Sequence, residues 1–211
     1  SSNVTNIGVT CTTNTYTVGG AVSGLSGSGL VLSLNAGAQT LTVAANGAFT
    51  FPTALASGSN YTVTVQTQPS GPAQSCSVTN GNGTVGASNV TNVTVTCATN
   101  TYTVGGSVTG LAGSGLVLSL NAGAQTLPVA ANDAFTFPTA LASGSSYAVT
   151  VQTQPASPTQ TCAVSNGSGT VVAANITSIA VNCTTNTYTI GGTVSGLAGT
   201  GLVLSLNAGA Q

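Results

Sequence analysis

The chain has 211 residues and contains no Lys, Arg, His or Glu, and Asp133 is its only charged side chain. General acid–base catalysis and activated serine nucleophiles both need a titratable group beside the reacting atoms, so this composition argues against an enzyme. It also argues against metal sites built from His or carboxylate clusters, and against binding of nucleic acid or anionic membranes through Lys and Arg. We therefore expect a non-enzymatic protein without cofactors.

The apolar residues are spread along the chain in short runs. These runs are far shorter than the roughly 20 residues that cross a bilayer, so we expect no membrane insertion in this segment. The chain is 41% hydrophobic with almost no charge, which is the opposite of a disordered composition. No basic region followed by an apolar stretch opens the sequence, so a secretion signal would lie outside it.

A long internal repeat organises the sequence. The motif NTYTVGG begins at Asn14 and Asn100, and NTYTIGG begins at Asn186, which gives a period of 86 residues. Such a period is close to the size of one small β-sandwich and too long for one coil of a solenoid. We predict four parts: the last strand of a preceding repeat, two complete repeats and the first strands of a following repeat, at residues 1–13, 14–99, 100–185 and 186–211.

Short segments of alternating polarity, separated by Gly, Asn, Ser and Pro, predict strands and no helices. We predict seven strands in the first repeat, at residues 16–24, 30–34, 40–45, 48–51, 60–66, 75–79 and 92–97. The alternation assigns one set of side chains to the core: Val18, Val22, Leu30, Leu32, Leu34, Leu41, Val43, Phe49, Phe51, Tyr61, Val63, Val65, Cys76, Val78, Val93, Val95 and Cys97. The expected fold class is all-β, with tandem seven-stranded β-sandwich repeats.

Two features refine this prediction for the third and fourth strands. Asn46-Gly47 lies between them, and Asn-Gly is typical of a two-residue hairpin turn with positive φ. The second repeat has Asn132-Asp133 there, and Asp tolerates the left-handed region, so we interpret Asp133 as a turn residue. Pro128 replaces Thr42 in the third strand and cannot donate to a ladder, which predicts an edge strand.

The five cysteines follow the repeat. Cys76 and Cys97 are 21 residues apart, and so are Cys162 and Cys183. The stretch NGNGTV or NGSGTV between them resembles a hairpin, so the last two strands of each repeat would lie antiparallel with their cysteines face to face. We predict disulfides Cys76–Cys97 and Cys162–Cys183, each contributing about 3 kcal/mol; the alternative is small buried thiols.

Cys11 is the odd cysteine. At the same spacing its partner would precede Ser1, so we expect it to be unpaired through truncation and not to be a reactive thiol. Disulfides form in oxidising compartments, which predicts an extracellular or cell-surface location.

The segments TVGGAVSG, LVLSLNAG, NGAFTFP and YTVTV, in this order, resemble short immunoglobulin-like β-sandwich modules that occur in tandem in very large secreted or surface-anchored bacterial proteins. They are also similar to the transthyretin or carboxypeptidase-regulatory type of sandwich. The resemblance covers the whole chain and implies a structural, adhesive or filament-forming role without catalytic residues. Some related modules carry a Lys–Asn isopeptide bond, which a chain without lysine cannot form.

Short linkers, ATNT after Cys97 and TTNT after Cys183, predict a stiff rod of repeats. With little charge to keep rods apart, self-association end to end or laterally is expected. We therefore predict a structural subunit of an extracellular filament or matrix fibre whose main partner is itself.

The alternative is an adhesin stalk or binding module for a carbohydrate or host surface. The aromatic candidates for a sugar platform are Tyr16, Tyr61, Phe49 and Phe51, and all four have core-compatible phases. A third hypothesis, ice binding, comes from two T-x-T spacings, Thr62 with Thr64 and Thr94 with Thr96. The second repeat weakens this hypothesis, because it replaces three of these threonines by Ala148, Ala180 and Asn182.

Overall fold

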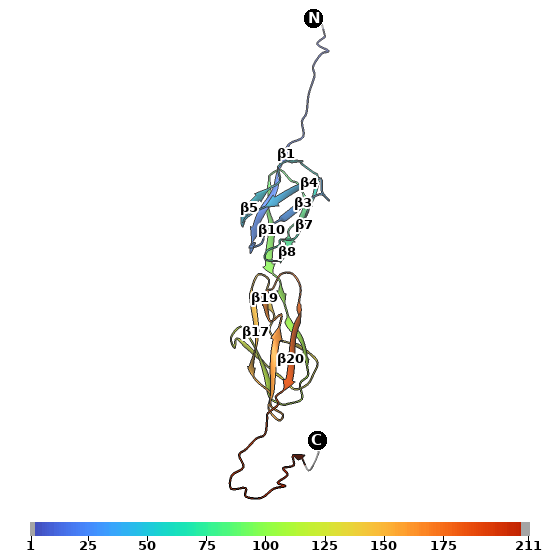
Figure 1. Cartoon of the computed structure of the whole chain (residues 1–211). Helices are drawn as coiled ribbons and strands as arrows, with labels where there is room; N and C mark the ends of the chain where they lie inside the picture. The colour runs from blue at the N-terminus through green and yellow to red at the C-terminus, as the bar shows by residue number, and fades with distance from the viewer. Residues whose placement is uncertain (1–2, 208–211) are drawn as a thin grey trace.

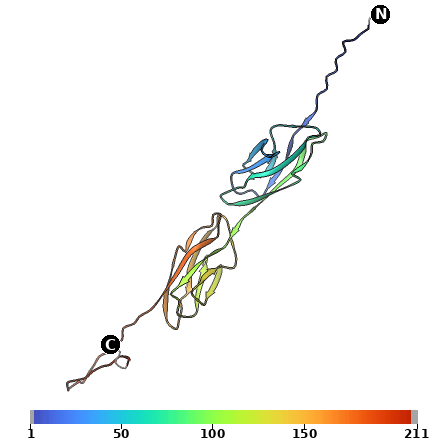
Figure 2. The same ribbon diagram turned by 90° about the vertical axis from the view of Figure 1, so that its right-hand side faces the viewer.

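The structure is a computed structural model that describes residues 3–207, and all of its regular elements of two or more residues are β-strands. Two β-sandwich units follow one another along an elongated molecule, and the terminal segments extend away from them (Figures 1 and 2). The all-β class is therefore confirmed. Among the described residues, none forms a helix of the length and apolarity that a membrane span requires.

Each unit contains ten strands. Those of unit 1 are β1 (Thr15–Tyr16), β2 (Val18–Ser23), β3 (Leu30–Leu34), β4 (Gln39–Val43), β5 (Gly47–Thr50), β6 (Leu55–Ala56), β7 (Asn60–Thr67), β8 (Gln74–Thr79), β9 (Asn82–Thr84) and β10 (Val90–Thr99). Those of unit 2 are β11 (Thr101–Tyr102), β12 (Val104–Thr109), β13 (Leu116–Leu120), β14 (Gln125–Val129), β15 (Ala134–Thr136), β16 (Leu141–Ala142), β17 (Ser146–Thr153), β18 (Gln160–Ser165), β19 (Ser168–Thr170) and β20 (Ile176–Thr185).

Two four-stranded sheets form the sandwich of each unit. In unit 1 their strand orders are β5-β2-β10-β8 and β4-β3-β7-β9, and β1 pairs separately with β6. Unit 2 repeats this arrangement with orders β15-β12-β20-β18 and β14-β13-β17-β19. The first long strand and the last one, β2 and β10, are parallel neighbours, while the other pairs are antiparallel.

The core lies between the two sheets and is filled by the side chains that alternation assigned to it. Phe51, Leu30 and Leu32 are fully buried, and the rings of Phe49 and Phe51 meet edge to face with their centroids 6.0 Å apart. Leu41, Val65 and Val78 are only partly buried and pack against this cluster. The core prediction is thus confirmed, with those three side chains at its margin.

The glycines of the TVGG motif allow β2 to lie between two close neighbours. A Cβ on Gly20 would lie 1.7 Å from the backbone oxygen of Val93 in β10, and one on Gly19 would lie 2.3 Å from that of Phe49. The register between β2 and β10 also shifts between Val90 and Val93. Only residues without a side chain fit at this crossing, which accounts for the glycine pair in each repeat.

The predicted seven strands are all present, and three short ones, β1, β6 and β9, occur in addition. The hairpin predicted between the cysteine strands is wrong, although β8 and β10 do pair antiparallel. The stretch between them crosses to the other sheet, where β9 pairs with β7. Backbone groups of this stretch thereby gain partners in the second sheet.

The hairpin predicted at Asn46-Gly47 is also wrong. β4 pairs with β3 and β5 pairs with β2, so the chain changes sheets at this point. Gly47 does have a positive φ of 130°. The φ of Asp133 is not positive, so this residue does not adopt the left-handed conformation expected for it. The edge position expected from Pro128 is confirmed, because β14 is an outer strand.

Candidate functional site

The cysteines of each unit lie opposite one another on neighbouring strands. Cys76 in β8 and Cys97 in β10 are cross-strand partners and form a disulfide, with their Cα atoms 3.9 Å apart. Cys162 and Cys183 form the corresponding bond in unit 2. Both disulfides are buried within the sandwich, so they fasten the last strand of each unit to the edge strand beside it. Cys11 is exposed and has no partner among the described residues.

Asp133 lies on the surface. Its carboxylate accepts a hydrogen bond from the backbone N–H of the next residue, Ala134, at 2.7 Å. Within residues 3–207, His, Cys, Asp and Glu do not gather into a group of three that could hold a metal ion.

The aromatic candidates for a sugar platform belong to the core. Phe49, Phe51 and Tyr61 are buried, and Tyr16 is half-buried against the same cluster. Tyr188 is 75% exposed, but it lies in the segment after β20. The described sandwich units thus give the carbohydrate hypothesis no exposed aromatic face.

The threonine pairs considered for ice binding are all exposed, but they do not form one surface. Thr62 and Thr64 lie in β7, whereas Thr94 and Thr96 lie in β10. These strands belong to opposite sheets of the sandwich, so the two pairs face away from each other. A flat threonine array spanning both pairs is therefore not formed.

Neutral amide side chains take the place of ion pairs in holding the loops. Gln74, 2% exposed, accepts hydrogen bonds from the N–H groups of Ser26 and Gly27 at 2.8 and 2.7 Å. Its Nε2 donates to the carbonyl of Gly24 at 2.8 Å and to Thr99 Oγ1 at 3.3 Å. One amide thereby fastens the loop between β2 and β3 to the end of the disulfide-bonded strand β8.

Four more amides of unit 1 each bridge a backbone donor and a backbone acceptor. Their partners are Thr62 N and Asn60 O for Asn35, Thr53 N and O for Gln39, Leu25 N and O for Asn46, and Cys76 N and O for Gln68. An amide can do this because it carries a donor and an acceptor side by side, as a peptide group does. Across the described residues, every buried side-chain nitrogen or oxygen has a partner.

The sequence-based prediction missed this role of Asn and Gln. The available signal is internal, because all five amides recur 86 residues later as Asn121, Gln125, Asn132, Gln154 and Gln160. Unit 2 forms the same set of bonds. Their partners could not be read from the sequence, because most lie in distant loops or strands.

The junction between the units is held by hydrogen bonds on both sides of a single linking residue. Asn100 alone separates β10 from β11, and its N–H donates to the carbonyl of Ala73 in unit 1 at 3.0 Å. Its carbonyl accepts from the N–H of Ser143 in unit 2 at 2.8 Å. Its side-chain oxygen accepts from Ser75 Oγ at 2.8 Å. The linking residue is thus fixed to both units.

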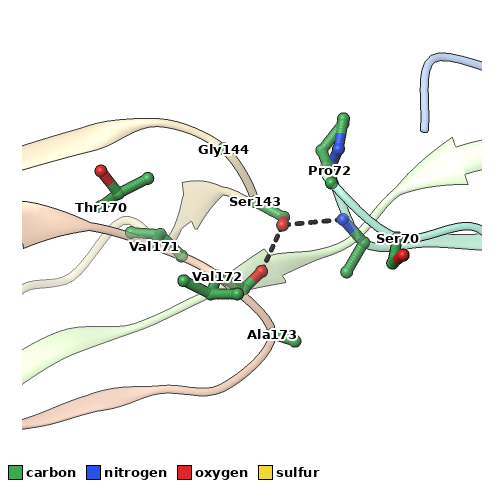
Figure 3. A pocket seen from close by; sticks show the side chains of 10 residues that line it. Ser70, Pro72, Ser143, Gly144, Thr170, Val171, Val172 and Ala173 are labelled. Atoms are coloured by element: carbon green, nitrogen blue, oxygen red, sulfur yellow. Dashed lines mark hydrogen bonds between the residues drawn. The ribbon is translucent and has the colours of Figure 1, made fainter. Parts of the chain in front are cut away.

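A second contact crosses the junction beside the linker. The N–H of Ala73 donates to Ser143 Oγ at 2.9 Å, and that hydroxyl donates in turn to the carbonyl of Val172 (Figure 3). Ser143 is buried. A small, mainly apolar cavity of about 230 Å³ lies between the units here, lined by Ser70, Gly71, Pro72, Ala73, Ser143, Gly144, Thr170, Val171, Val172 and Ala173.

The free ends of the two units repeat parts of this junction. At the start of unit 1, Ser57 donates its N–H to the carbonyl of Asn14 and its hydroxyl to that of Gly86, both at 2.9 Å. At the end of unit 2, Asn186 donates its N–H to the carbonyl of Thr159 at 3.0 Å. Each end therefore presents one half of the arrangement that joins the units.

Comparison with known proteins adds little to this description. No protein-family model matches the chain, and no curated protein matches it. Among solved structures, it is similar to the major pilin protein T-13 of Streptococcus pyogenes, with 14% sequence identity and a TM-score of 0.28. The alignment covers 83% of this chain and 98% of the pilin chain.

Proposed function

We propose that this chain is a structural segment of an extracellular filament or matrix fibre. The fibre is built from tandem β-sandwich repeats, each cross-linked internally by one disulfide. The chain is a non-enzymatic protein in this proposal, and its main partner is another copy of itself. The observation that carries the proposal is the junction at Asn100, where backbone and side-chain groups of one residue are bonded to both units. A linker held in this way transmits orientation from one unit to the next.

The terminal segments support a continuous array. Val4, Ile7 and Val9 are 73 to 83% exposed, whereas Val93 and Val95, which match two of them in the repeat, are buried. The segment after β20 likewise exposes six apolar residues whose counterparts in unit 1 are core residues: Ile190, Val194, Leu197, Leu202, Leu204 and Leu206. We assign residues 1–13 to the last strand of a preceding repeat and 186–211 to the first strands of a following one; residues 1–2 and 208–211 of these parts lie outside the described residues.

The disulfides and amide hydrogen bonds that hold the units together are suited to a fibre exposed to its surroundings. Disulfides are stable in oxidising surroundings outside the cytoplasm. The amide bridges carry no net charge, so neither acid nor salt weakens them in the way that it weakens ion pairs. This combination favours a fibre that keeps its form where pH and ionic strength vary.

Small-angle X-ray scattering and electron microscopy test the proposal. The chain should be compared with one extended by a further 86-residue repeat. The cross-section should stay that of one sandwich, while the length increases by a constant step. A compact particle, or freely jointed beads whose mean length grows much more slowly than the number of repeats, would contradict the proposed rod.

A further inference from the structure

One side of each sandwich carries a groove between two outer strands. In unit 1 the groove lies between β4 and β5, has a volume of about 320 Å³, and is lined by residues of both strands that include Leu41, Thr42 and Ala48. Unit 2 has the equivalent groove of about 310 Å³ between β14 and β15. These strands are edges of different sheets, so unpaired backbone groups flank the groove on both sides.

The register shows which backbone groups of β4 are free. Asn35, which follows β3, donates its N–H to the carbonyl of Thr62 in β7 at 2.8 Å. Backbone groups along an antiparallel strand point alternately to its two neighbours, so those of Leu34 point to β4. Leu34 lies opposite Gln39, so the backbone groups of Gln39 point back to β3. The alternation along β4 then directs the N–H and C=O of Thr40 and Thr42 away from β3.

Unit 2 differs from unit 1 at this edge. Pro128 in β14 corresponds to Thr42 in β4. It lies opposite Val117 of β13, just as Thr42 lies opposite Val31 of β3. Because its nitrogen points outward and carries no hydrogen, the ladder inside the sheet is kept while the outer edge loses a donor. Pro128 therefore blocks strand addition without disturbing β14.

The second difference lies on the other strand of the groove. Val108 donates its N–H to the carbonyl of Asp133 at 2.9 Å, so the following residue, Ala134, directs its own N–H outward. The carboxylate of Asp133 accepts this N–H at 2.7 Å. In unit 1 the corresponding residue is Gly47, which has no side chain, and the outward N–H of Ala48 is left open. The only charge in the chain thus covers an edge donor.

The opposite edge of unit 1 is covered in another way. The amide of Gln68 occupies the outward N–H and C=O of Cys76 in β8, and the N–H of Gln74 donates to the carbonyl of Pro69. The remaining outer strand, β9, has only three residues. The backbone groups of Thr40 and Thr42 in β4 have no comparable partner from outside their sheet among the described residues.

We propose that β4 of unit 1 is a lateral interaction site that pairs antiparallel with β4 of a second copy, and that Pro128 and Asp133 close the equivalent site of unit 2. In this pairing Leu41 faces its own counterpart, and Thr40 of each copy exchanges both backbone bonds with Thr42 of the other. The two sheets become one continuous sheet. Each chain then makes lateral contacts through unit 1 and none through unit 2.

A second copy is the occupant that the chemistry favours. The edge is self-complementary under two-fold rotation, and cross-strand threonine pairs are favourable neighbours. Unit 1 has no charged side chain, so charge does not oppose the approach of an identical surface. Pro and charged residues are the usual means of preventing edge-to-edge association, and unit 2 carries one of each at the equivalent groove.

Sedimentation velocity of the full chain over a range of concentrations tests the proposal with matched variants. The unchanged chain should dimerise reversibly. Thr42→Pro copies unit 2 and should weaken the association constant by roughly tenfold or more, the effect of losing one or two net hydrogen bonds. Thr42→Val keeps the N–H and should change it by no more than roughly threefold. An unchanged association constant in Thr42→Pro, with folding verified by thermal denaturation, would overturn the proposal.

The reverse change opens the second groove. Pro128→Thr combined with Asp133→Gly gives unit 2 the residues of unit 1 and should produce oligomers larger than dimers, because both units can then pair. A chain that stays monomeric at all concentrations, or a double variant that associates no further than the unchanged chain, would count against the site. This proposal goes beyond the proposed rod. A stiff chain that associates equally well with and without Thr42→Pro would refute the lateral site and leave the rod unaffected.

Discussion

The backbone N–H of Ala73 donates a hydrogen bond to Ser143 Oγ across the boundary between the two units, at a distance of 2.9 Å. The same hydroxyl donates to the carbonyl of Val172, so it links a loop of unit 1 to two loops of unit 2. Together with Asn100, it gives the junction two separate points of attachment. Bending at the linker would have to break one of them.

Ser143→Ala should loosen the junction without unfolding either unit. The substitution removes both bonds of the hydroxyl, at a cost of about 1 kcal/mol or more. Residual dipolar couplings or small-angle X-ray scattering should show a wider range of angles between the units. The matched control is Ser57→Ala, where the equivalent hydroxyl bonds only within unit 1, to Gly86. Equal angular distributions in the two variants would show that Ser143 does not stiffen the rod.

Replacing Cys76 and Cys97 together by Ala should destabilise unit 1 selectively. The disulfide closes a loop with a sequence separation of 21, and its loss costs about 3 kcal/mol in the chain-entropy model. For a domain of this size the melting temperature should fall by roughly 10–20 °C. Hydrogen exchange read by mass spectrometry can follow each unit separately. The matched variant at Cys162 and Cys183 should move the loss of protection to unit 2, and a loss spread equally over both units would contradict this assignment.

Gln74→Leu tests the amide bridges. The side chain of Leu is of similar size but leaves the N–H groups of Ser26 and Gly27 and the carbonyl of Gly24 without their partner. Because this site is buried, we expect a loss of roughly 3 kcal/mol or more in the free energy of unfolding. Denaturant unfolding measures the effect, and Gln66→Leu, at an exposed position, is the control. Similar stabilities for both variants would mean that the bridge contributes little.

Stability should be nearly independent of pH and salt. It varies with pH only where the folded and unfolded states bind different numbers of protons. Asp133 is the only charged side chain, it is exposed, and its hydrogen-bond partner is the adjacent residue. We expect melting temperatures at about pH 5 and pH 8 to agree within about 2 °C, at low and high salt alike. Asp133→Asn should behave identically, and a shift of many degrees in the unchanged chain would reveal an ionising group that matters.

Features that depend on local periodicity were predictable. Strand side chains alternate between two faces, so the phases of Val93, Val95 and Cys97 could be read directly from their spacing. Pro128 identified an edge for an equally local reason, because proline has no N–H. The equal spacing of the cysteines then indicated the pairing that the structure shows between Cys76 and Cys97.

Pairing between distant strands was less accessible. Asn46-Gly47 has the composition of a hairpin turn, yet the strands on either side join different sheets. The turn signal reports only the local backbone, whereas the choice of sheet depends on which neighbours bury the flanking strands. The same limit applies to β9, whose partner β7 lies in the sheet opposite to that of β8 and β10.

By itself, the sequence determined the repeat, the strand-forming segments, their core faces and the near absence of charge, because each of these depends on residue type and spacing alone. Tertiary structure decided the rest: that Gln74 reaches three distant loop residues, that Ser143 bonds to Ala73, and that Asp133 covers an edge donor. An amide or hydroxyl can bond to almost any backbone group, so its partner is fixed only when the fold brings one particular group within reach.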